Sequence, residues 1–389
     1  MNRHLTRTLV FAAFALALTA AGKPRARDLG VPFDGTPGAL NAITDVKGVE
    51  VGQTTLIRGE GVLKPGQGPV RTGVTVILPR GKRSKDPVFA GWFSLNGNGE
   101  MTGTTWVEES GFMEGPMAIT NTHSVGVVRD AIIAWQFQHD LLRGAFALPV
   151  VAETNDGWLN DINGFHVKPE HVLHALETAS PGPVAEGNVG GGTGMHCYDF
   201  KGGTGTASRK LPAAAGGYTV GVLVQANFGT RRHLMVAGAP VGKEISCDKY
   251  PCRPVAQPAP ARDGSIIIVV ATDAPLIAPQ LRRMAVRASL GIARTGGMSG
   301  NGSGDIFLAF STANPGAAED PDAPMVRMLS NRRIDDLFEA TVFATEEAVI
   351  NAMVAAETMV GRDYHQWVGL PHEELKQVLR KYGRLANSK

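Results

Sequence analysis

The sequence predicts an α/β fold with β-sheets in the middle of the molecule and helices over both outer faces. Short apolar runs rich in β-branched residues alternate along the chain with segments of helical periodicity. The run 266–270 is apolar at every position, as expected for a strand that is buried on both faces. Many of the 48 glycines lie between apolar runs, which indicates tight turns around a sheet-based core.

Strands are predicted where a short apolar run is bounded by turn-forming residues, at 88–94, 118–120, 148–152, 218–225, 234–237, 266–272 and 306–311. Helices are predicted where apolar residues recur at helical spacing, at 127–139, 169–178, 278–290, 334–360 and 371–382. Pro169 suits a first helical turn, and Gly291 and Gly383 suit helix ends.

The N-terminus has the pattern of a secretory signal. Basic residues precede an apolar run at 9–18, and small residues follow at 19–22. The apolar run is shorter than the roughly 20 residues that cross a membrane. We expect residues 1–22 to be a signal peptide, which predicts an exported, periplasmic protein with no membrane attachment after its removal. The alternative is a hydrophobic first helix of the fold.

Composition excludes several classes of protein. Hydrophobic residues make up 43% and charged residues 19%, so the chain can form a sizeable core. The net charge of +2, with no long run of one sign, argues against a nucleic-acid partner. Three cysteines are too few for a disulfide framework; Cys247 and Cys252 either form a local bridge or remain free thiols. Cys197 is expected to be buried and not a nucleophile.

Common catalytic and ligand-binding motifs are missing from the sequence or weak. It contains neither the G-x-S-x-G elbow nor a Walker phosphate loop. The glycines of 190–209 suit structural turns better than an anion cradle. His166, His171 and His174 lack a neighbouring metal-binding motif, so we predict neither a metal nor another cofactor.

Polar residues at the ends of predicted strands are candidate site residues. Asn227 ends one apolar run, Glu153 ends a second, and Ser303 and Asp305 precede a third. Side chains at strand ends commonly form sites, although turn formation favours the same residue types.

Ser265 is the strongest candidate, because a proline- and alanine-rich stretch at 257–262 leads through Gly264 into a buried strand that starts at this serine. The alternative is a serine that caps a turn. The Ser265 hydroxyl lies next to the poorly shielded Gly264 carbonyl and is placed to attack it. Cleavage there yields an α-chain, 23–264, and a β-chain, 265–389. The new α-amino group, with an ordinary pKa of roughly 7.7–8.0, can act as a base toward its own hydroxyl.

Five segments resemble one known family: DGSIIIVVATDAPL, VQANFG, GNGSGDIFLAFSTAN, ITNTHSVGVVRDA and AETNDGWLNDINGFHV. They are similar to the L-aminopeptidase/D-alanyl esterase-amidases and β-peptidyl aminopeptidases, which are self-processing serine hydrolases. The resemblance extends over nearly all of the chain after residue 22. It implies a four-layer αββα sandwich similar to N-terminal nucleophile hydrolases but with different connectivity, and a homo-oligomer of α/β heterodimers.

The same resemblance implies roles for the candidate residues. Ser265 matches the nucleophile and Asn227 the amide that stabilises the oxyanion. Ser303 matches the residue that orients Ser265, and Asp305 the acid that holds Ser303. Glu153 matches the acid that receives the free amino group of the substrate. Relatives can carry a tyrosine where this chain has Asn155, with Trp158 nearby, and neither residue inherits the role of that tyrosine.

We therefore predict an aminopeptidase that releases one N-terminal residue, of the β, D-alanyl or L type, from short peptides, amides or esters. The reaction proceeds through an acyl-enzyme on Ser265. One alternative is an acyltransferase of the acetylornithine type, in which the nucleophile is a threonine. The other is an inactive binding protein, which would have lost a catalytic residue, whereas all four are present.

Overall fold

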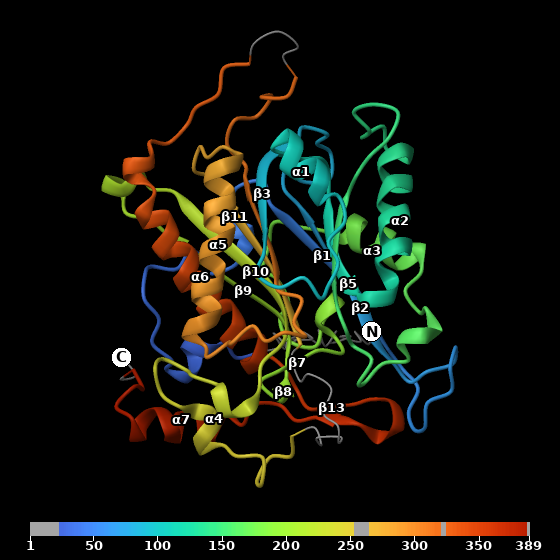
Figure 1. Ribbon diagram of the computed structural model, residues 1–389, viewed down its shortest axis with the longest axis vertical. Helices are drawn as coiled ribbons and strands as arrows, with labels where there is room; N and C mark the ends of the chain where they lie inside the picture. Colours follow the sequence, from blue (N-terminus) through green and yellow to red (C-terminus); the bar gives the residue numbers. More distant parts are fainter. Residues whose placement is uncertain (1–22, 253–263, 320–323, 387–389) are drawn as a thin grey trace, which may run out of the picture.

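The computed structural model describes residues 23–252, 264–319 and 324–386, so the predicted signal peptide lies outside the described residues. Two sheets pack face to face between two layers of helices (Figure 1). One sheet has the order β4–β3–β12–β11–β10–β9: β3 (Val88–Ser94), β4 (Phe112–Met113), β9 (Gly203–Lys210), β10 (Thr219–Asn227), β11 (Ser265–Thr272) and β12 (Ile306–Ser311). The other has the order β1–β2–β5–β6: β1 (Glu50–Arg58), β2 (Val70–Leu78), β5 (Met117–Asn121) and β6 (Val150–Thr154).

Helices cover the outer face of each sheet. The six-stranded sheet packs against α5 (Ala278–Arg294) and α6 (Asp335–Val354), and the four-stranded sheet packs against α2 (Val125–Gln138) and α3 (Pro169–Thr178). Figure 1 shows these two helix pairs on opposite sides of the strands. The remaining helices are short or peripheral: α1 (Thr104–Ser110), α4 (Val241–Glu244) and α7 (His372–Lys381).

Strand β11 demonstrates the four layers, because its side chains alternate between two buried cores. Ile266, Ile268 and Val270 join the core under α5 and α6. Ile267 and Val269 join the core between the two sheets, together with residues of β5 and β6. Both faces of this strand are therefore buried, and the predicted αββα sandwich is confirmed.

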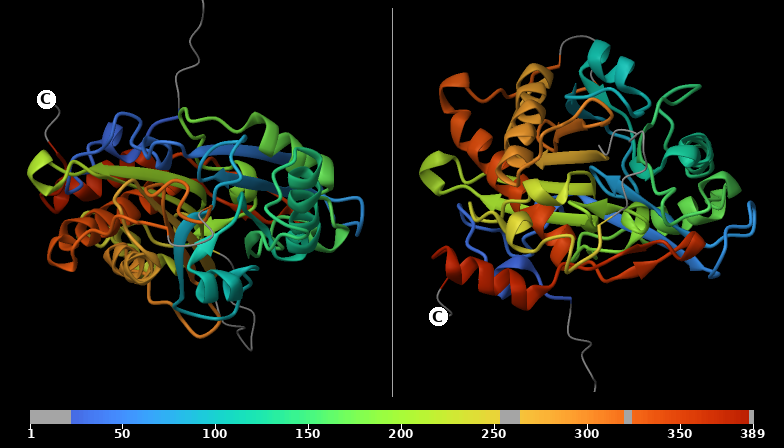
Figure 2. Two further views of the ribbon diagram at one scale, coloured as in Figure 1. Left: turned by 90° about the horizontal axis from the view of Figure 1, so that it is seen from above. Right: turned by 60° about the horizontal axis from the view of Figure 1, so that its bottom comes forward.

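Two small hairpins lie at one end of the molecule. β7 (His196–Cys197) pairs with β8 (Phe200–Lys201), and β13 (Met359–Val360) pairs with β14 (Gln366–Trp367). Helix α7 and the β13–β14 hairpin, both red in Figures 1 and 2, extend along this end beneath the sheets.

One predicted strand is wrong, and two predicted helices end at other residues: the helix at 278–290 continues through Gly291 to Arg294. Residues 234–237 do not form a strand: they follow a short 3-10 helix and turn back through a bridge between Val236 and Ala239. Leu234 and Val236 are apolar because this turn is itself buried. The predicted helix at 334–360 ends at Val354, and Met359–Val360 instead forms β13.

The cysteines and His166 make contacts that stabilise the fold. Cys247 and Cys252 form a disulfide, and Cys197 is buried, as predicted. His166 contacts the Asp161 carboxylate at 2.9 Å, and no group of three metal-ligating side chains occurs within the described part of the chain.

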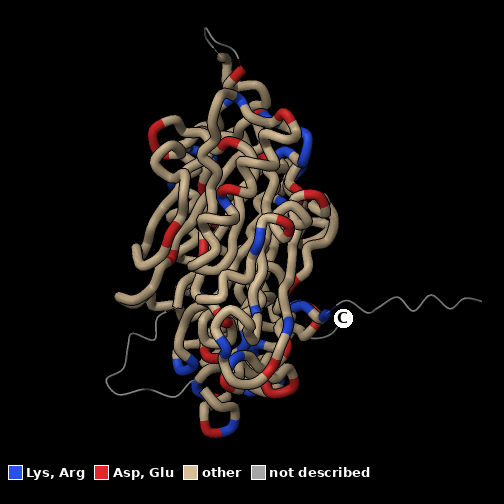
Figure 3. The backbone as a smooth tube through the Cα atoms, turned by 90° about the vertical axis from the view of Figure 1, so that its right-hand side faces the viewer, with Lys and Arg blue, Asp and Glu red and all other residues tan. Residues whose placement is uncertain are grey.

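The surface carries charges of both signs. On the side of the molecule in Figure 3, Lys and Arg are interspersed with Asp and Glu. None of the helices in the described ranges has the length and apolar character needed to cross a membrane.

Candidate active site

Strand directions bring the predicted catalytic residues to one edge of the six-stranded sheet. β11 is antiparallel to β10 and parallel to β12. The end of β10 therefore lies beside the starts of β11 and β12. This places Asn227 directly opposite Ser265, with Ser303 and Asp305 immediately before the neighbouring strand. The Ser265 residue is only 9% exposed.

Ser303 lies between an acid and the peptide bond at which we predict cleavage. Its Oγ is 2.5 Å from the Gly264 carbonyl oxygen and 2.6 Å from Asp305 Oδ1. A hydroxyl has one proton, so Ser303 donates to one of these oxygens at a time. Asp305 Oδ1 also accepts the Ile266 N–H, at 3.2 Å, which ties the acid to β11.

The Ser265 hydroxyl accepts a hydrogen bond from the Gly304 N–H at 3.1 Å. In this uncut chain Ser303 therefore contacts the Gly264 carbonyl, while Gly304 contacts the hydroxyl of Ser265. The segment 303–305 holds both sides of the Gly264–Ser265 bond.

Gly264 is required by close packing. A Cβ at this position would lie 1.7 Å from the Asn227 carbonyl oxygen and 2.9 Å from Phe228 Cα. Because backbone atoms cannot yield as a flexible side chain can, only glycine lets the chain pass beside the end of β10.

The side chain of Asn227 is held at both ends. Its Oδ1 accepts the His196 N–H at 3.1 Å, and its Nδ2 donates to the Asn155 carbonyl at 3.0 Å. A backbone donor on one side and a carbonyl acceptor on the other define the orientation of the amide. Within the described residues the second Nδ2 hydrogen has no partner, which leaves one donor for a developing oxyanion.

Glu153 lies at the end of β6, in the other sheet, and is buried. Its carboxylate accepts the Glu100 N–H at 3.0 Å and the Thr122 hydroxyl. Burial raises the pKa of Glu153, and these two hydrogen bonds oppose that increase. A Cβ on Gly99 would be 3.3 Å from both Glu153 Oε1 and Gly304 Cα. A single glycine thus separates the acid from the segment that contacts Ser265.

Asn155, which stands where relatives can carry a tyrosine, and the nearby Trp158 both direct their side chains to neighbouring residues. The Asn155 side chain is turned back to accept the Gly157 N–H at 2.8 Å. Trp158 stacks on His365, with 3.6 Å between ring centroids, and lies beside Trp367. Asn155 reaches the site through its backbone, because its carbonyl accepts a hydrogen bond from Asn227.

Two residues that the sequence analysis did not single out support the site. The buried Gln225 Nε2 donates to the Thr120 carbonyl at 2.9 Å and to the Thr154 hydroxyl at 2.8 Å. Gln225 therefore joins the two sheets close to Asn227 and Glu153. In the sequence, the only sign of this role is a polar residue inside an apolar strand. Asp156, two residues after Thr154, is buried and accepts a hydrogen bond from Asn160 at 3.0 Å, and burial raises its pKa to about 7.

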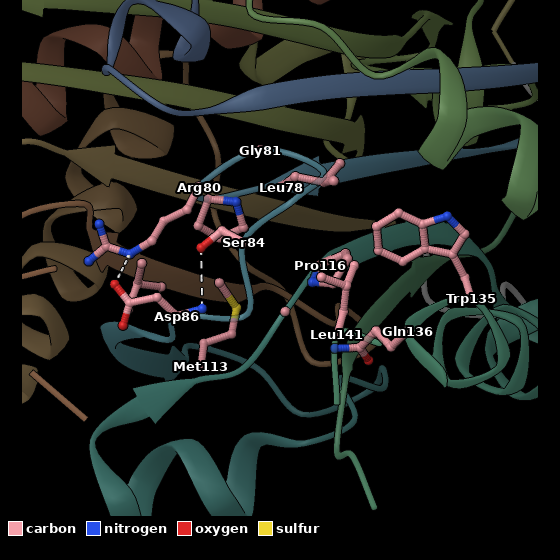
Figure 4. A pocket seen from close by; sticks show the side chains of 13 residues that line it. Leu78, Arg80, Gly81, Ser84, Asp86, Met113, Pro116, Trp135, Gln136 and Leu141 are labelled. Carbon is pink, nitrogen blue, oxygen red and sulfur yellow. Dashed lines mark hydrogen bonds and ion pairs between the residues drawn. The ribbon is translucent and has the colours of Figure 1, made fainter. Parts of the chain in front are cut away.

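A separate polar pocket contains none of the candidate site residues. It lies between the end of β2, the start of β3 and helix α2 (Figure 4). Arg80 pairs with Asp86 at 3.2 Å on one side, and Trp135 and Gln136 form the other side.

Comparison with known proteins identifies the family of the chain. Residues 41–367 match peptidase family S58. The chain is 57% identical to the β-peptidyl aminopeptidase BapA of Sphingosinicella microcystinivorans, over 99% of this chain and all of the relative. A solved structure of the L-aminopeptidase D-Ala-esterase/amidase of Ochrobactrum anthropi, a variant of the Ntn hydrolase fold, is 49% identical, with a TM-score of 0.84 over 94% of this chain and all of that one. A Burkholderia β-aminopeptidase is also 49% identical, with a TM-score of 0.83 over 92% of this chain and 99% of that one.

These matches confirm the family resemblance, the sandwich fold and the enzyme class that the sequence predicts. A family match over most of the chain and a close relative of equal length point to the same activity. The chain belongs to peptidase family S58 and is a hydrolase, an aminopeptidase of the serine N-terminal nucleophile class.

Proposed function

We propose that the chain cuts its own Gly264–Ser265 bond and then uses Ser265 as the nucleophile of a β-peptidyl aminopeptidase. The observation that carries this proposal is the contact of Ser303 Oγ with the carbonyl oxygen of Gly264, the residue before Ser265, at 2.5 Å. A donor on that oxygen polarises the carbonyl carbon that Ser265 would attack.

Self-cleavage proceeds in two steps. Ser265 Oγ adds to the Gly264 carbonyl carbon, its proton passes to the peptide nitrogen, and the C–N bond breaks so that this nitrogen leaves as the neutral α-amine of Ser265. The acyl group of Gly264 is now an ester on Oγ. Water hydrolyses this ester, which leaves a carboxylate on Gly264 and restores the Ser265 hydroxyl beside a free amine.

Substrate turnover uses the same atoms. The Ser265 amine takes the proton from Oγ as the oxygen attacks the substrate carbonyl, and the free N–H of Asn227 stabilises the oxyanion. The protonated amine then gives its proton to the leaving amine, and an acyl-enzyme remains. Water attacks this ester with the amine as base, and the released acid restores the enzyme.

Glu153 is proposed to bind the ammonium group of the substrate. Its carboxylate is close to the segment that contacts Ser265 but belongs to the opposite sheet, so a short aminoacyl group can extend between them. The relative with 57% identity is a β-peptidyl aminopeptidase, which supports a β-amino acid as the released residue.

The location and assembly of the enzyme are proposed on sequence grounds. The basic, apolar and small-residue order of residues 1–22 supports export to the periplasm. The family resemblance supports a homo-oligomer of α/β heterodimers.

Two measurements test the proposal. Mass spectrometry of the purified protein should give two polypeptides that separate between Gly264 and Ser265. Hydrolysis of the p-nitroanilides of a β-amino acid, L-alanine and D-alanine should be fastest for the first. A single intact mass in active protein would overturn the self-cleavage, and faster release of L- or D-alanine would overturn the substrate assignment.

A further inference from the structure

We propose that Lys201 is a positioning residue for the reaction, acting on Asn227 through the peptide bond between Met195 and His196. The proposal rests on the proposed function, because it assigns to Asn227 the stabilisation of the oxyanion. It adds a buried amine behind the oxyanion site, on the side opposite to the substrate.

The Lys201 side chain is completely buried at the end of β8. Its Nζ donates to the carbonyl oxygens of Met195 and Gly202, each at 2.7 Å, and approaches that of Gly192 at 3.4 Å. Three acceptors match the three N–H donors of an ammonium group. Burial lowers the pKa of Lys201 far below its usual value, whereas three carbonyl acceptors favour the charged form. The amine donates to Met195 in either protonation state.

Two of these contacts belong to one hydrogen-bonded chain. The Met195 carbonyl accepts from Lys201, and the N–H of the same peptide group, on His196, donates to Asn227 Oδ1 at 3.1 Å. One Nδ2 hydrogen of Asn227 donates to the Asn155 carbonyl, and the other is the proposed oxyanion donor. The order is therefore amine, peptide group, side-chain amide and oxyanion, with every donor pointing in the same direction.

Such a chain strengthens its last donor. Each hydrogen bond polarises the next, by about 10–30% per bond in condensed-phase estimates. Withdrawal of electron density from the Met195 carbonyl makes the His196 N–H a stronger donor, and this in turn makes the Asn227 N–H more positive. The benefit is largest when negative charge develops on the substrate oxygen, so it acts mainly on kcat.

The residue also restricts the position of this peptide. Lys201 connects the carbonyls on both sides of the β7–β8 hairpin. The His196 N–H therefore cannot turn away from Asn227 unless the hydrogen bond between Lys201 and the Met195 carbonyl is broken. The hairpin is further anchored at Lys201 itself, whose backbone N–H donates to the Val368 carbonyl at 2.7 Å.

The test is a double-mutant cycle with Lys201→Met and Asn227→Ala, with rates normalised to the amount of cleaved chain. Lys201→Met alone should lower kcat by about tenfold, less than the loss from a missing oxyanion donor, and should leave KM within about twofold. In the Asn227→Ala background the same substitution should cost less than about twofold, since its effect passes through Asn227.

Arg209→Met provides a control. Arg209 is another buried cation that donates to backbone carbonyls, and it also pairs with the Glu347 carboxylate at 2.8 Å. In the strand ladder it lies opposite Val220, at the other end of β10 from Asn227. We expect this variant to lose stability and to retain kcat once folded. If Lys201→Met does not fold, Lys201→Gln, which keeps two N–H donors without the charge, replaces it in the cycle.

Three outcomes overturn the inference: a folded Lys201 variant with unchanged kcat, a loss that adds in full to that of Asn227→Ala, or failure of both Lys201 variants to fold, which would make the residue purely structural. Activity in a Ser265→Ala variant would instead contradict the proposed function, so the two failures are distinguishable.

Discussion

Asn227 and Ser265 are directly opposite each other in the antiparallel ladder of β10 and β11. A shift of this register by one residue would turn every side chain of a strand to the other face. Because β11 is buried on both faces, such a shift is strongly opposed. The relative position of the proposed nucleophile and the proposed oxyanion amide is therefore set by strand pairing, and not by a loop.

Ser265→Ala should give an uncut and inactive chain, since both self-cleavage and turnover need the hydroxyl. Mass spectrometry should find one polypeptide, and hydrolysis of a β-amino acid p-nitroanilide should fall to background. Ser289→Ala, on helix α5, is a matched control that should be processed normally. Two fragments separated at Gly264–Ser265 in the Ser265→Ala protein would contradict the mechanism.

Asn227→Ala should lower kcat by about a hundredfold or more, because it removes a donor aimed at the oxyanion. The unfolding midpoint should also decrease, since the His196 N–H and the Asn155 carbonyl both lose a partner. Steady-state kinetics at a temperature where the variant is folded separate the two effects. An unchanged kcat would remove Asn227 from the mechanism.

Gly264→Ala should impair folding and block cleavage, because the added methyl would lie 1.7 Å from the Asn227 carbonyl oxygen. Relief of that clash requires a shift of β11 relative to β10, which also moves Ser265 away from Asn227. Electrophoresis and thermal unfolding of the variant measure both effects. A matched substitution is Gly126→Ala on helix α2, where a Cβ meets no atom within 4 Å and should be tolerated. Normal processing of Gly264→Ala would show that the close packing is not required.

Glu153 should produce a pH dependence in KM. Its carboxylate binds the substrate ammonium only when ionised, and burial raises its pKa. KM should therefore increase as the pH falls through a range above the ordinary glutamate pKa of about 4.3. Kinetics from pH 5 to pH 8 measure this range. A KM that does not vary with pH would argue against an ammonium partner.

The same carboxylate should reduce stability at higher pH. A raised pKa means that the folded state binds the proton more tightly than the unfolded state, so stability is lost as pH rises through the folded-state pKa. Glu153→Gln should raise KM by about tenfold or more and keep or increase the unfolding midpoint at pH 8. Glu339→Gln, an exposed glutamate on helix α6, is the matched control and should change neither KM nor the unfolding midpoint. A lower midpoint in Glu153→Gln would contradict this reasoning.

The candidate site around Ser265 could be located in the sequence because its signals are local. A loose segment, a glycine, a serine and a fully apolar strand follow one another in a few residues. Strands β1, β2 and β9 were not among the predicted elements. In β9, GTGTASRK, small residues replace the apolar pattern because a Cβ on Gly205 would lie 2.0 Å from the Ala348 carbonyl of α6. Close helix packing selected the glycine, and the resulting sequence resembles a turn.

The residues that support the site could not be predicted in this way. Lys201 acts on Asn227 through the backbone of another segment, and Gln225 depends on contacts with the opposite sheet. Such roles depend on segments that are far apart in the sequence. For the same reason the buried turn at 234–237 was mistaken for a strand, since burial of a loop produces the same apolar pattern.

The order of strands in the six-stranded sheet has a thermodynamic consequence. β11 and β12 lie side by side, with β10 on one flank and β3 on the other. After the proposed cut, the two central strands belong to one polypeptide and both flanking strands to the other. Unfolding then releases two molecules where the precursor releases one, so the unfolding midpoint of the mature enzyme should rise with protein concentration. Refolding of the mature enzyme becomes a bimolecular search, while the precursor folds as a single chain and becomes two only afterwards.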